Sequence, residues 1–526
     1  MLPGMIVCMP VCTETPAVEI ARALEDYLAE HPQAAVLEDG KVLFDMRTAH
    51  YSLTTERDRC LLHLWSDEGN LVRTVSGVEL RKGALRFATR RFGQPRPQTL
   101  EMVSDRDRRS PSTREAARAR HQRLLERVQL RVFPGWSLDG FRVATDLENS
   151  FGPAYTRGTL VRGNAAWAVI AVNAEETPST IDGILTVGIL WLAYCREHGD
   201  GRRVFEGLKI VVPSGASPVV QARMAWLDEA AAKWELYELD ERCEELVPVD
   251  IRSYGNLSSR LVHAFDPDAA LERCRASIDT VLGLLLPGMR AAIEICPRSP
   301  AEIAFLLHGL EFARVRHVLV AGSFARRDEI TFGAGANETP LNDETAELFS
   351  EMTQRLFENR TAGGTRRNPL FRLQPERWLE SVLRRDLPEI EPSLRTEILY
   401  SQVPAFSAGD RGMLDLLTVT RSGRLAVIEV KADDDLHLPV QALDYWARVR
   451  QLQREDAFRK HGYFQKIELS GQPPLLYLIA PALRVHPSTD TVLRHFSPDV
   501  PWELIGVSED WRKRRKVIFR KRPKGS

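Results

Sequence analysis

The last third of the chain alternates between short apolar runs and longer stretches whose apolar residues recur at helical spacing. Residues 375–387 and 438–452 show the helical spacing, and the first of them begins with a proline. Short apolar runs bounded by turn residues favour strands. The expected order is helix 375–387, strand 396–403, strand 412–419, strand 425–432, helix 438–452 and strand 475–480.

Charged residues interrupt the two central strands. The turn at 421–424 joins these strands as a hairpin, which sets Asp415 beside Glu429. Residues i and i+2 of a strand share a face, so Glu429 and Lys431 lie about 6 to 7 Å apart on one side. Burying an unpaired charge is costly, so these residues need either mutual pairing or a function. Pairing would mean an ion pair between Glu429 and Lys431, or side chains whose ends reach solvent.

A metal site is the functional alternative. Mg²⁺ is usually held by one or two carboxylates together with waters and phosphate oxygens of the substrate. Asp415 and Glu429 meet that requirement. A lysine beside such a site can position or deprotonate the attacking water, because partial burial eases the loss of its proton. Lys431 fits this second role.

A set of residues in this segment matches a known family. The set is Glu380 in the first helix, Asp415, Glu429, Lys431, and the motif Gln441-x-x-x-Tyr445 on the following helix. With these residues the segment from about 370 to 520 resembles the PD-(D/E)xK nuclease superfamily, most closely its RecB-like branch. The family often has a proline before the first acidic residue, whereas Met413 and Leu414 stand there in this chain.

The resemblance implies a restriction-endonuclease-like α/β domain that hydrolyses phosphodiester bonds. Asp415 and Glu429 would bind Mg²⁺ or Mn²⁺, and Lys431 would orient the nucleophile. Gln441 and Tyr445 would support the site or touch substrate. DNA is the expected substrate, in repair, recombination or defence, while RNA and the choice between exonuclease and endonuclease stay open. The alternative is a non-catalytic nucleic-acid-binding or scaffold protein that keeps the fold. An iron–sulfur cluster, found in part of this branch, is excluded because residues 297–526 contain no cysteine.

Basic residues are concentrated at the C-terminal end. Residues 511–524 include nine lysines and arginines, a density that can neutralise several phosphates. The predicted nucleic-acid contacts are Arg512, Lys513, Arg514, Arg515 and Lys516. The alternative is a solvated tail. Two other basic stretches, 106–123 and 360–367, are interpreted as linkers. The net charge of −1, from 71 basic and 72 acidic residues, gives no general attraction to a polyanion.

An earlier part of the chain repeats the pattern of the predicted nuclease segment. Residues 168–173 align with 426–431, which puts Ala171 in place of the glutamate and Asn173 in place of the lysine. The elements expected to follow are helix 181–196, strand 208–213, helix 218–233 and strand 234–239, in the same order as in the later segment. We interpret residues 115–245 as a degenerate, inactive copy of the nuclease fold that forms a pseudo-dimer with it. The alternative is that strand, helix, strand order recurs in any α/β unit.

The remaining segments complete a multidomain α/β protein. A helix over 14–30 and alternating segments from 34 to 91 predict a small antiparallel β domain. Helical patterns at 268–286, 299–312 and 341–357 predict a mainly helical connector. The expected domains are 1–105, 115–245, 250–365 and 370–526.

Composition narrows the function classes. The apolar content of 44% and charged content of 27% are typical of soluble globular proteins. Seven cysteines without a paired framework favour a reducing compartment, and no basic leader or long apolar run is present, so a cytoplasmic protein without a membrane anchor is expected. The sequence contains no Gly-x-x-x-x-Gly-Lys-Ser/Thr loop, so we do not expect it to be an ATPase. His437 is the histidine close to the predicted site and is interpreted as a loop residue.

Overall fold

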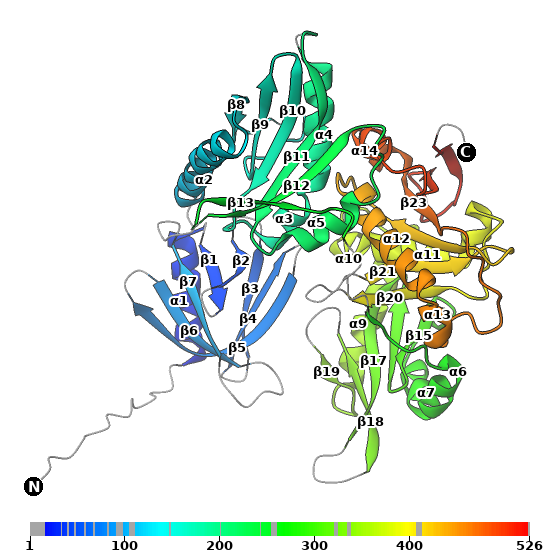
Figure 1. Ribbon diagram of the computed structural model, residues 1–526. Coiled ribbons are helices and arrows are strands. Elements are labelled where there is room, and N and C mark those ends of the chain that lie inside the picture. Colours follow the sequence, from blue (N-terminus) through cyan, green and yellow to red (C-terminus); the bar gives the residue numbers. More distant parts are fainter. Residues whose placement is uncertain are drawn as a thin grey trace, which may run out of the picture. The chain divides into compact units, whose positions relative to one another are not determined.

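A computed structural model describes the chain from residue 16 to residue 523 (Figure 1). Within this span the description leaves out residues 33, 39–40, 47–48, 57–58, 67–68, 82–83, 91–97, 105–110, 147–148, 200, 242, 254–259, 320–324, 334–337 and 407–412. The chain divides into two compact units, residues 1–116 with 333–339, and residues 117–332 with 340–526. No helix in the described part of the chain is long and apolar enough to cross a membrane.

The first unit is an antiparallel sheet with a helix packed on it. Helix α1 (Ala17–Glu30) buries Ile20, Leu24 and Leu28 against the sheet. The helix expected over 14–30 and the strands expected between 34 and 91 are present, and β7 is a strand that the sequence pattern did not predict. The strands lie in the order β2 (Lys41–Asp45), β1 (Ala35–Glu38), β7 (Gln98–Val103), β6 (Ala84–Arg90), β5 (Gly69–Arg81), β4 (Arg59–Ser66) and β3 (His50–Glu56).

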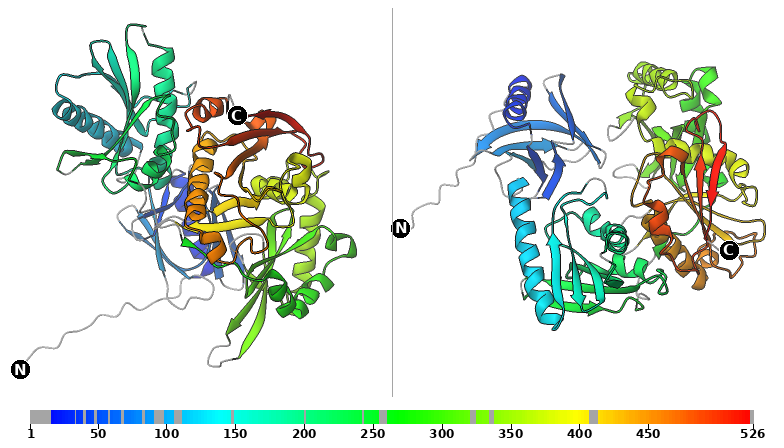
Figure 2. Two further views of the ribbon diagram at one scale, coloured as in Figure 1. Left: turned by 45° about the vertical axis from the view of Figure 1, so that its right-hand side comes forward. Right: turned by 90° about the horizontal axis from the view of Figure 1, so that it is seen from above.

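Within the second unit, residues 117–253 form what we call the first lobe. Helix α2 (Pro111–Val132) packs on one face of its sheet and helix α4 (Ile184–Glu197) covers the other (Figure 2). The helix expected over 218–233 is wrong in length, because α5 (Ser217–Met224) ends at Met224 and the chain then turns. The strands lie in the order β13 (Glu245–Val249), β12 (Lys233–Asp240), β11 (Val204–Pro213), β10 (Ala165–Val172), β9 (Tyr155–Arg162) and β8 (Ser137–Arg142).

Residues 375–523 form the second lobe, which contains the predicted nuclease segment. Helix α11 (Pro375–Ile390) packs on one face of the sheet and helix α12 (Leu438–Arg454) on the other. The elements expected in this segment are present, although β20 begins later than predicted. The strand order is β14 (Arg260–Leu261), β20 (Tyr400–Phe406), β21 (Met413–Val419), β22 (Leu425–Val430), β23 (Leu475–Pro481), β24 (Trp502–Val507) and β25 (Val517–Lys521).

The two lobes share one order of strand pairing. In the first lobe β9–β10 is antiparallel, β10–β11 and β11–β12 are parallel, and β12–β13 is antiparallel. The pairs β21–β22, β22–β23, β23–β24 and β24–β25 repeat this sequence in the second lobe. In each case α4 or α12 connects the first parallel pair. The lobes therefore have the same connectivity in this part of the fold.

Strand register corrects the residue alignment between the lobes. Trp234 pairs with Leu208, which pairs with Ala168, while Trp502 pairs with Leu476, which pairs with Val427. On this register the equivalents of Glu429, Lys431 and Asp415 are Ile170, Val172 and Arg157. The alignment that placed Ala171 and Asn173 there is wrong by one residue.

The direction of the side chains shows why the earlier alignment fails. Ala171 belongs to the cluster under α2, whereas Ile170 lies on the α4 side. In the second lobe Val427 lies on the side of α12, the equivalent of α4, and Glu429 shares its face. A slip of one residue moves every side chain to the opposite face of a sheet.

The connector between the lobes contains a sheet, so the expectation of a mainly helical segment is wrong. The helix expected over 299–312 is instead a hairpin that turns at His308 and Gly309, with φ of 48° and 75°. Its apolar run is buried on both sides, and such a run fits helix and strand spacing equally well. The elements are α6 (Pro267–Arg273), α7 (Arg275–Gly283), α8 (Pro287–Arg290), β15 (Ile293–Ser299), β16 (Glu302–Leu307), β17 (Leu310–Leu319), β18 (Arg326–Phe332), β19 (Thr339–Pro340) and α9 (Ala346–Asn359).

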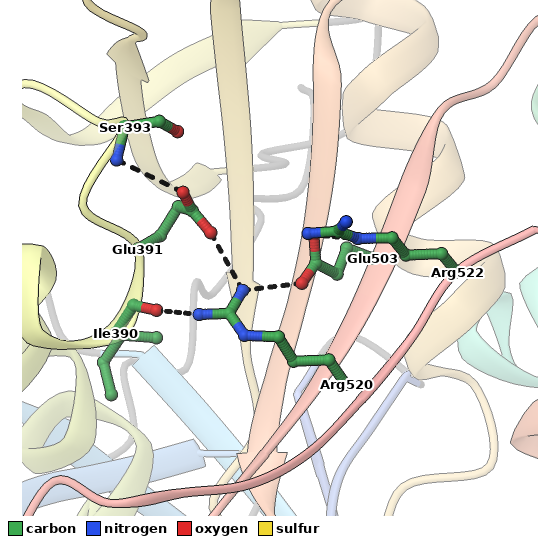
Figure 3. Close-up of polar contacts among 6 residues, drawn as sticks. All are labelled: Ile390, Glu391, Ser393, Glu503, Arg520 and Arg522. Atoms are coloured by element: carbon green, nitrogen blue, oxygen red, sulfur yellow. Dashed lines mark hydrogen bonds and ion pairs between the residues drawn. The ribbon is translucent and has the colours of Figure 1, made fainter. Parts of the chain in front are cut away.

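The basic C-terminal segment includes the edge strand β25 and is not simply a solvated tail. Arg520 donates hydrogen bonds to Glu391 at 2.8 Å and to Glu503 at 2.6 Å, and also bonds the carbonyl of Ile390 (Figure 3). Arg522 donates to the other oxygen of Glu503 at 2.9 Å. These charges are thus used to hold the edge strand against its neighbours.

Candidate active site

The hairpin β21–β22 brings the two predicted metal-binding carboxylates together. Leu416 pairs with Ile428, so Asp415 and Glu429 occupy the next positions along the two strands. The backbone N–H of Val430 donates to Asp415 Oδ2 at 2.9 Å. Glu429 is 1% exposed, and its Oε2 is buried without a hydrogen-bond partner. A buried carboxylate oxygen without a partner is costly. Asp415 lies within hydrogen-bonding reach of the Glu429 carboxyl group, so the two groups can share a proton or bind one cation.

Lys431 lies just after the end of β22 and is held by two acidic side chains. Its Nζ is 3.6 Å from Glu376 Oε1 and 3.5 Å from Asp435 Oδ2. Glu376 comes from the first turn of α11, and Asp435 from the loop before α12. Sequence reasoning did not select these two residues. The acidic triplet at 433–435, shortly after Lys431, was the signal that could have indicated Asp435.

Burial and crowding raise the pKa values of the acidic residues. Burial is the largest cause for Glu429, whose pKa lies well above its usual range, and the Asp415 carboxylate adds to the effect. Burial also raises the pKa values of Asp415, Glu376 and Glu380. These four carboxyl groups lie close together with few positively charged side chains near them. An added positive charge would therefore favour their ionised forms.

The surroundings of Lys431 correct one expectation. Burial lowers the pKa of Lys431, but the carboxylates of Glu376, Glu429, Asp435 and Asp415 together outweigh burial and raise the pKa. The expectation that partial burial would ease the loss of its proton is therefore wrong for this arrangement. A charged Lys431 can donate hydrogen bonds to water or phosphate but does not accept a proton.

Glu380 lies buried on α11, one turn after Glu376 and on the same face of the helix. It is 5% exposed, and Arg377 Nη1 lies 3.1 Å from its Oε2. Asp415 is close enough to contribute to the raised pKa of Glu380, after burial and against the effect of Arg377. The structure thus brings Glu380 near Asp415 and gives it Arg377 as a cationic partner.

The motif on α12 lies beside Glu429. Gln441 Nε2 donates to the hydroxyl of Tyr445 at 3.3 Å. Tyr445 is buried, and its pKa is raised by burial first and by the Glu429 carboxylate second. The i, i+4 spacing puts both side chains on one helix face. Tyr445 therefore lies near Glu429, and Gln441 reaches the site through Tyr445.

The predicted basic contacts fall into two groups. The Arg512 guanidinium stacks on Trp511 at 4.0 Å and on Trp378 at 4.7 Å, and burial lowers its pKa to about 10. Arg515 forms an ion pair with Asp386. Lys513, Arg514 and Lys516 are exposed. The exposed residues and Arg512 remain candidates for phosphate contact, while Arg515 already has an acidic partner.

Arg360, which lies in a stretch interpreted as a linker, is fully buried. Its guanidinium stacks on Trp378 at 4.7 Å. It donates hydrogen bonds to carbonyls of the connector hairpin and of the turn before α11, at Leu307, His308, Leu370, Leu373 and Gln374. Arg360 thus ties the hairpin to the start of the helix that carries Glu376 and Glu380. No pattern in the sequence distinguishes it from a linker arginine. The interpretation of residues 106–123 as a linker is also wrong from residue 111 onwards, because helix α2 begins at Pro111.

The donor set fits a divalent cation bound by few protein ligands. No group of three or more His, Cys, Asp or Glu side chains among the described residues is arranged to hold a metal ion. Asp415 and Glu429 supply two carboxylates, and the unpaired Glu429 Oε2 is the atom that lacks a partner. Mg²⁺ commonly takes one or two carboxylates and fills its other positions with water and phosphate oxygens. The residues present therefore suit Mg²⁺ or Mn²⁺.

Comparisons with known proteins give little further information. No protein-family model matches the chain, and no curated protein matches it. One matching solved structure is a complex of EndoMS with double-stranded DNA. The match has 14% identity and a TM-score of 0.19, and covers 43% of this chain and 95% of that chain. A likeness at this TM-score carries no argument, so conclusions about function depend on the residues of the site.

Proposed function

We propose that the second lobe is a metal-dependent nuclease of the PD-(D/E)xK type that hydrolyses phosphodiester bonds of DNA. The observation that carries this proposal is the convergence of Asp415 and Glu429 with a buried oxygen left unpaired. An internal ion pair between Glu429 and Lys431 does not account for it. The ion-pair partners of Lys431 are Glu376 and Asp435, and Glu429 Oε2 has no hydrogen-bond partner.

The residues of the site suggest separate roles. Asp415 and Glu429 would hold Mg²⁺ or Mn²⁺, which supplies positive charge to the phosphate oxygens when bound. Lys431, fixed by Glu376 and Asp435, would donate hydrogen bonds that orient the attacking water or the phosphate. Gln441 and Tyr445 would support Glu429 from α12. Glu380 would act through its contact with Arg377 and its closeness to Asp415.

Contacts to the DNA backbone would come from basic residues near the site. Arg512 is close enough to Asp433 for that carboxylate to act on its pKa, and Asp433 follows Lys431 in the same loop. Lys513, Arg514 and Lys516 are exposed on the following turn. Basic side chains of this kind position a nucleic acid by its phosphates and carry no sequence preference.

The first experiment is cleavage of linear, circular and single-stranded DNA with Mg²⁺ or Mn²⁺. We expect metal-dependent cutting by the wild type and its loss in Asp415→Ala and Lys431→Ala. Ile170→Leu is the matched control, because this residue occupies the position of Glu429 in the first lobe. Matched DNA and RNA oligonucleotides in competition would identify the preferred substrate.

Two results would contradict the proposal. Cutting that persists in Asp415→Ala would place the activity elsewhere or in a contaminant. Absence of cutting with DNA still bound in EDTA would instead support a non-catalytic binding or scaffold protein.

A further inference from the structure

The two lobes contact each other as the halves of a symmetric dimer do. Gly183 precedes α4 and His437 precedes α12, and these equivalent residues meet. A Cβ atom at Gly183 would lie 2.8 Å from Cε1 of His437. Likewise α5 packs on α12, while α14 (Thr489–Leu493), the equivalent of α5, packs on α4. His437 is thus a contact residue between lobes and not simply a loop residue.

A short β-bridge repeats the same reciprocity. Leu227, three residues after α5 ends, pairs antiparallel with Phe496, three residues after α14 ends. The residue after Leu227 donates from its backbone N to the carbonyl of the residue before Phe496. The residue after Phe496 donates to the residue before Leu227, and both bonds measure 2.8 Å. In an interface with two-fold symmetry each contact occurs twice with the partners exchanged, so a local two-fold axis relates the lobes.

The chemistry of the two lobes is not symmetric. At the positions of Asp415, Glu429 and Lys431 the first lobe has Arg157, Ile170 and Val172. Arg157 is 1% exposed, and its guanidinium lies over the ring of Phe151 at 4.6 Å and that of Trp191 at 5.9 Å. A guanidinium and two aliphatic side chains offer no ligand to a divalent cation. The first lobe therefore keeps the fold without a cation site at these positions.

We infer that a single chain binds duplex DNA with both lobes and cuts only one strand in each encounter, leaving a nick. This inference rests on the proposed nuclease function of the second lobe. The two strands of a duplex are related by two-fold axes perpendicular to the helix, and proteins with two-fold symmetry place one equivalent element on each half. Two lobes related in this way would face one strand each, and one of them lacks the catalytic residues.

The test is the time course of products from supercoiled plasmid with Mg²⁺ or Mn²⁺ and the protein below the plasmid concentration. We expect nicked circles to accumulate first and linear DNA to appear only after a lag, when independent nicks meet on opposite strands. Mixing wild type with Asp415→Ala should reduce the nicking rate in proportion to the wild-type fraction, because each chain acts alone.

Pairing of the lobes has a separate test that does not depend on activity. Leu227 and Phe496 form a non-hydrogen-bonded antiparallel pair, whose Cα atoms lie about 4.5 Å apart and within disulfide range. Leu227→Cys with Phe496→Cys should form an intramolecular disulfide under mild oxidation, detected by peptide mass analysis. Each single variant is the control, and absence of the bond in the folded double variant would overturn the pairing.

Failure of the inference differs from failure of the proposed function. Linear DNA that appears without a lag would show that two catalytic sites act together. A nicking rate that is not proportional to the wild-type fraction would show the same. Either result would overturn the inference that each encounter cuts one strand. Degradation of linear DNA with circles untouched would also overturn it while the nuclease proposal stands. No metal-dependent cutting of any DNA would remove both.

Discussion

The two lobes have the same strand connectivity but place different chemistry at the same positions. The second lobe has Asp415 and the buried Glu429 in its central hairpin, where the first lobe has Arg157 and Ile170. Ile170 fills its position with apolar contacts and is fully buried. Glu429 at the same depth keeps an unpaired oxygen, which costs stability. The comparison shows that the fold does not need these charges, so their presence in one lobe points to a function.

The largest expected effect is on catalysis by Glu429→Gln. This change keeps the shape but removes a carboxylate, and we expect cleavage to fall by about 10² to 10³-fold, as when a preorganised electrostatic group is lost. Ile170→Leu should leave the rate within about twofold, because core swaps of equal volume are tolerated. Cleavage rates of both variants on one substrate provide the measurement, and equal losses in the two would contradict the distinction between the lobes.

A second prediction concerns buried titratable side chains on α2 and α11, the first helix of each lobe. Burial lowers the pKa of His121 on α2 to about 4 from an ordinary 6.5, whereas burial raises that of Glu380 on α11. The unfolded chain binds a proton at His121 more readily than the folded chain does. The free energy of unfolding is therefore unaffected by His121 above pH 6.5 and decreases as the pH falls towards 4. The shift corresponds to about 3 kcal/mol.

Unfolding at pH 7 and at pH 4.5 tests this dependence in wild type and His121→Gln. The variant should lose less stability on acidification. His308, whose pKa is also lowered to about 4 by burial, titrates in both proteins and cancels in the difference. Identical pH slopes would show that His121 does not carry the effect.

Cation binding should stabilise only through the second lobe. If Asp415 and Glu429 hold Mg²⁺ or Mn²⁺, a concentration 100 times the dissociation constant adds about 2.7 kcal/mol to the free energy of unfolding. Thermal unfolding with and without the ion should show this gain in wild type and in Ile170→Leu. Glu429→Gln should show none, and it should raise Tm without the ion because it removes a buried ionisable group that the Asp415 carboxylate repels. A gain retained by Glu429→Gln would place the ion elsewhere.

The smallest expected change in stability, that of Gly163→Ala, belongs to a comparison of the two hairpin turns. Gly163 between β9 and β10 and Gly423 between β21 and β22 have φ of 59° and 80°. A Cβ at Gly163 meets nothing within 4 Å, whereas one at Gly423 would overlap the carbonyl of Glu468. We expect Gly163→Ala to cost about 1 kcal/mol from backbone strain and Gly423→Ala about 2 to 4 kcal/mol. Denaturant unfolding checks both, and equal costs would contradict the close approach at Gly423.

Local patterns were enough to predict most of the second lobe. Apolar spacing placed α11, α12 and the strands β21, β22 and β23, and the short turn at 421–424 predicted the hairpin. Charges in an apolar strand then indicated Asp415, Glu429 and Lys431. Their separation along the chain was short, so the hairpin alone could bring the two carboxylates together.

Other features failed where local pattern was ambiguous. The run at 299–312 is apolar on both faces, so spacing did not separate hairpin from helix. The one-residue error over Ala171 came from matching letters without knowing which face each strand buries. Asp435 and Arg377 were missed because their importance depends on the side chains they meet.

The sequence by itself determined the elements of the second lobe, their order, and the three charged residues of its central strands. The tertiary structure decided the register between the lobes, the burial of Arg360, the charge state favoured for Lys431 and the reciprocal contacts around Leu227 and Phe496. The physical reason is range. Spacing and turn preference act over a few residues, whereas burial and pairing depend on groups that folding brings from hundreds of positions away.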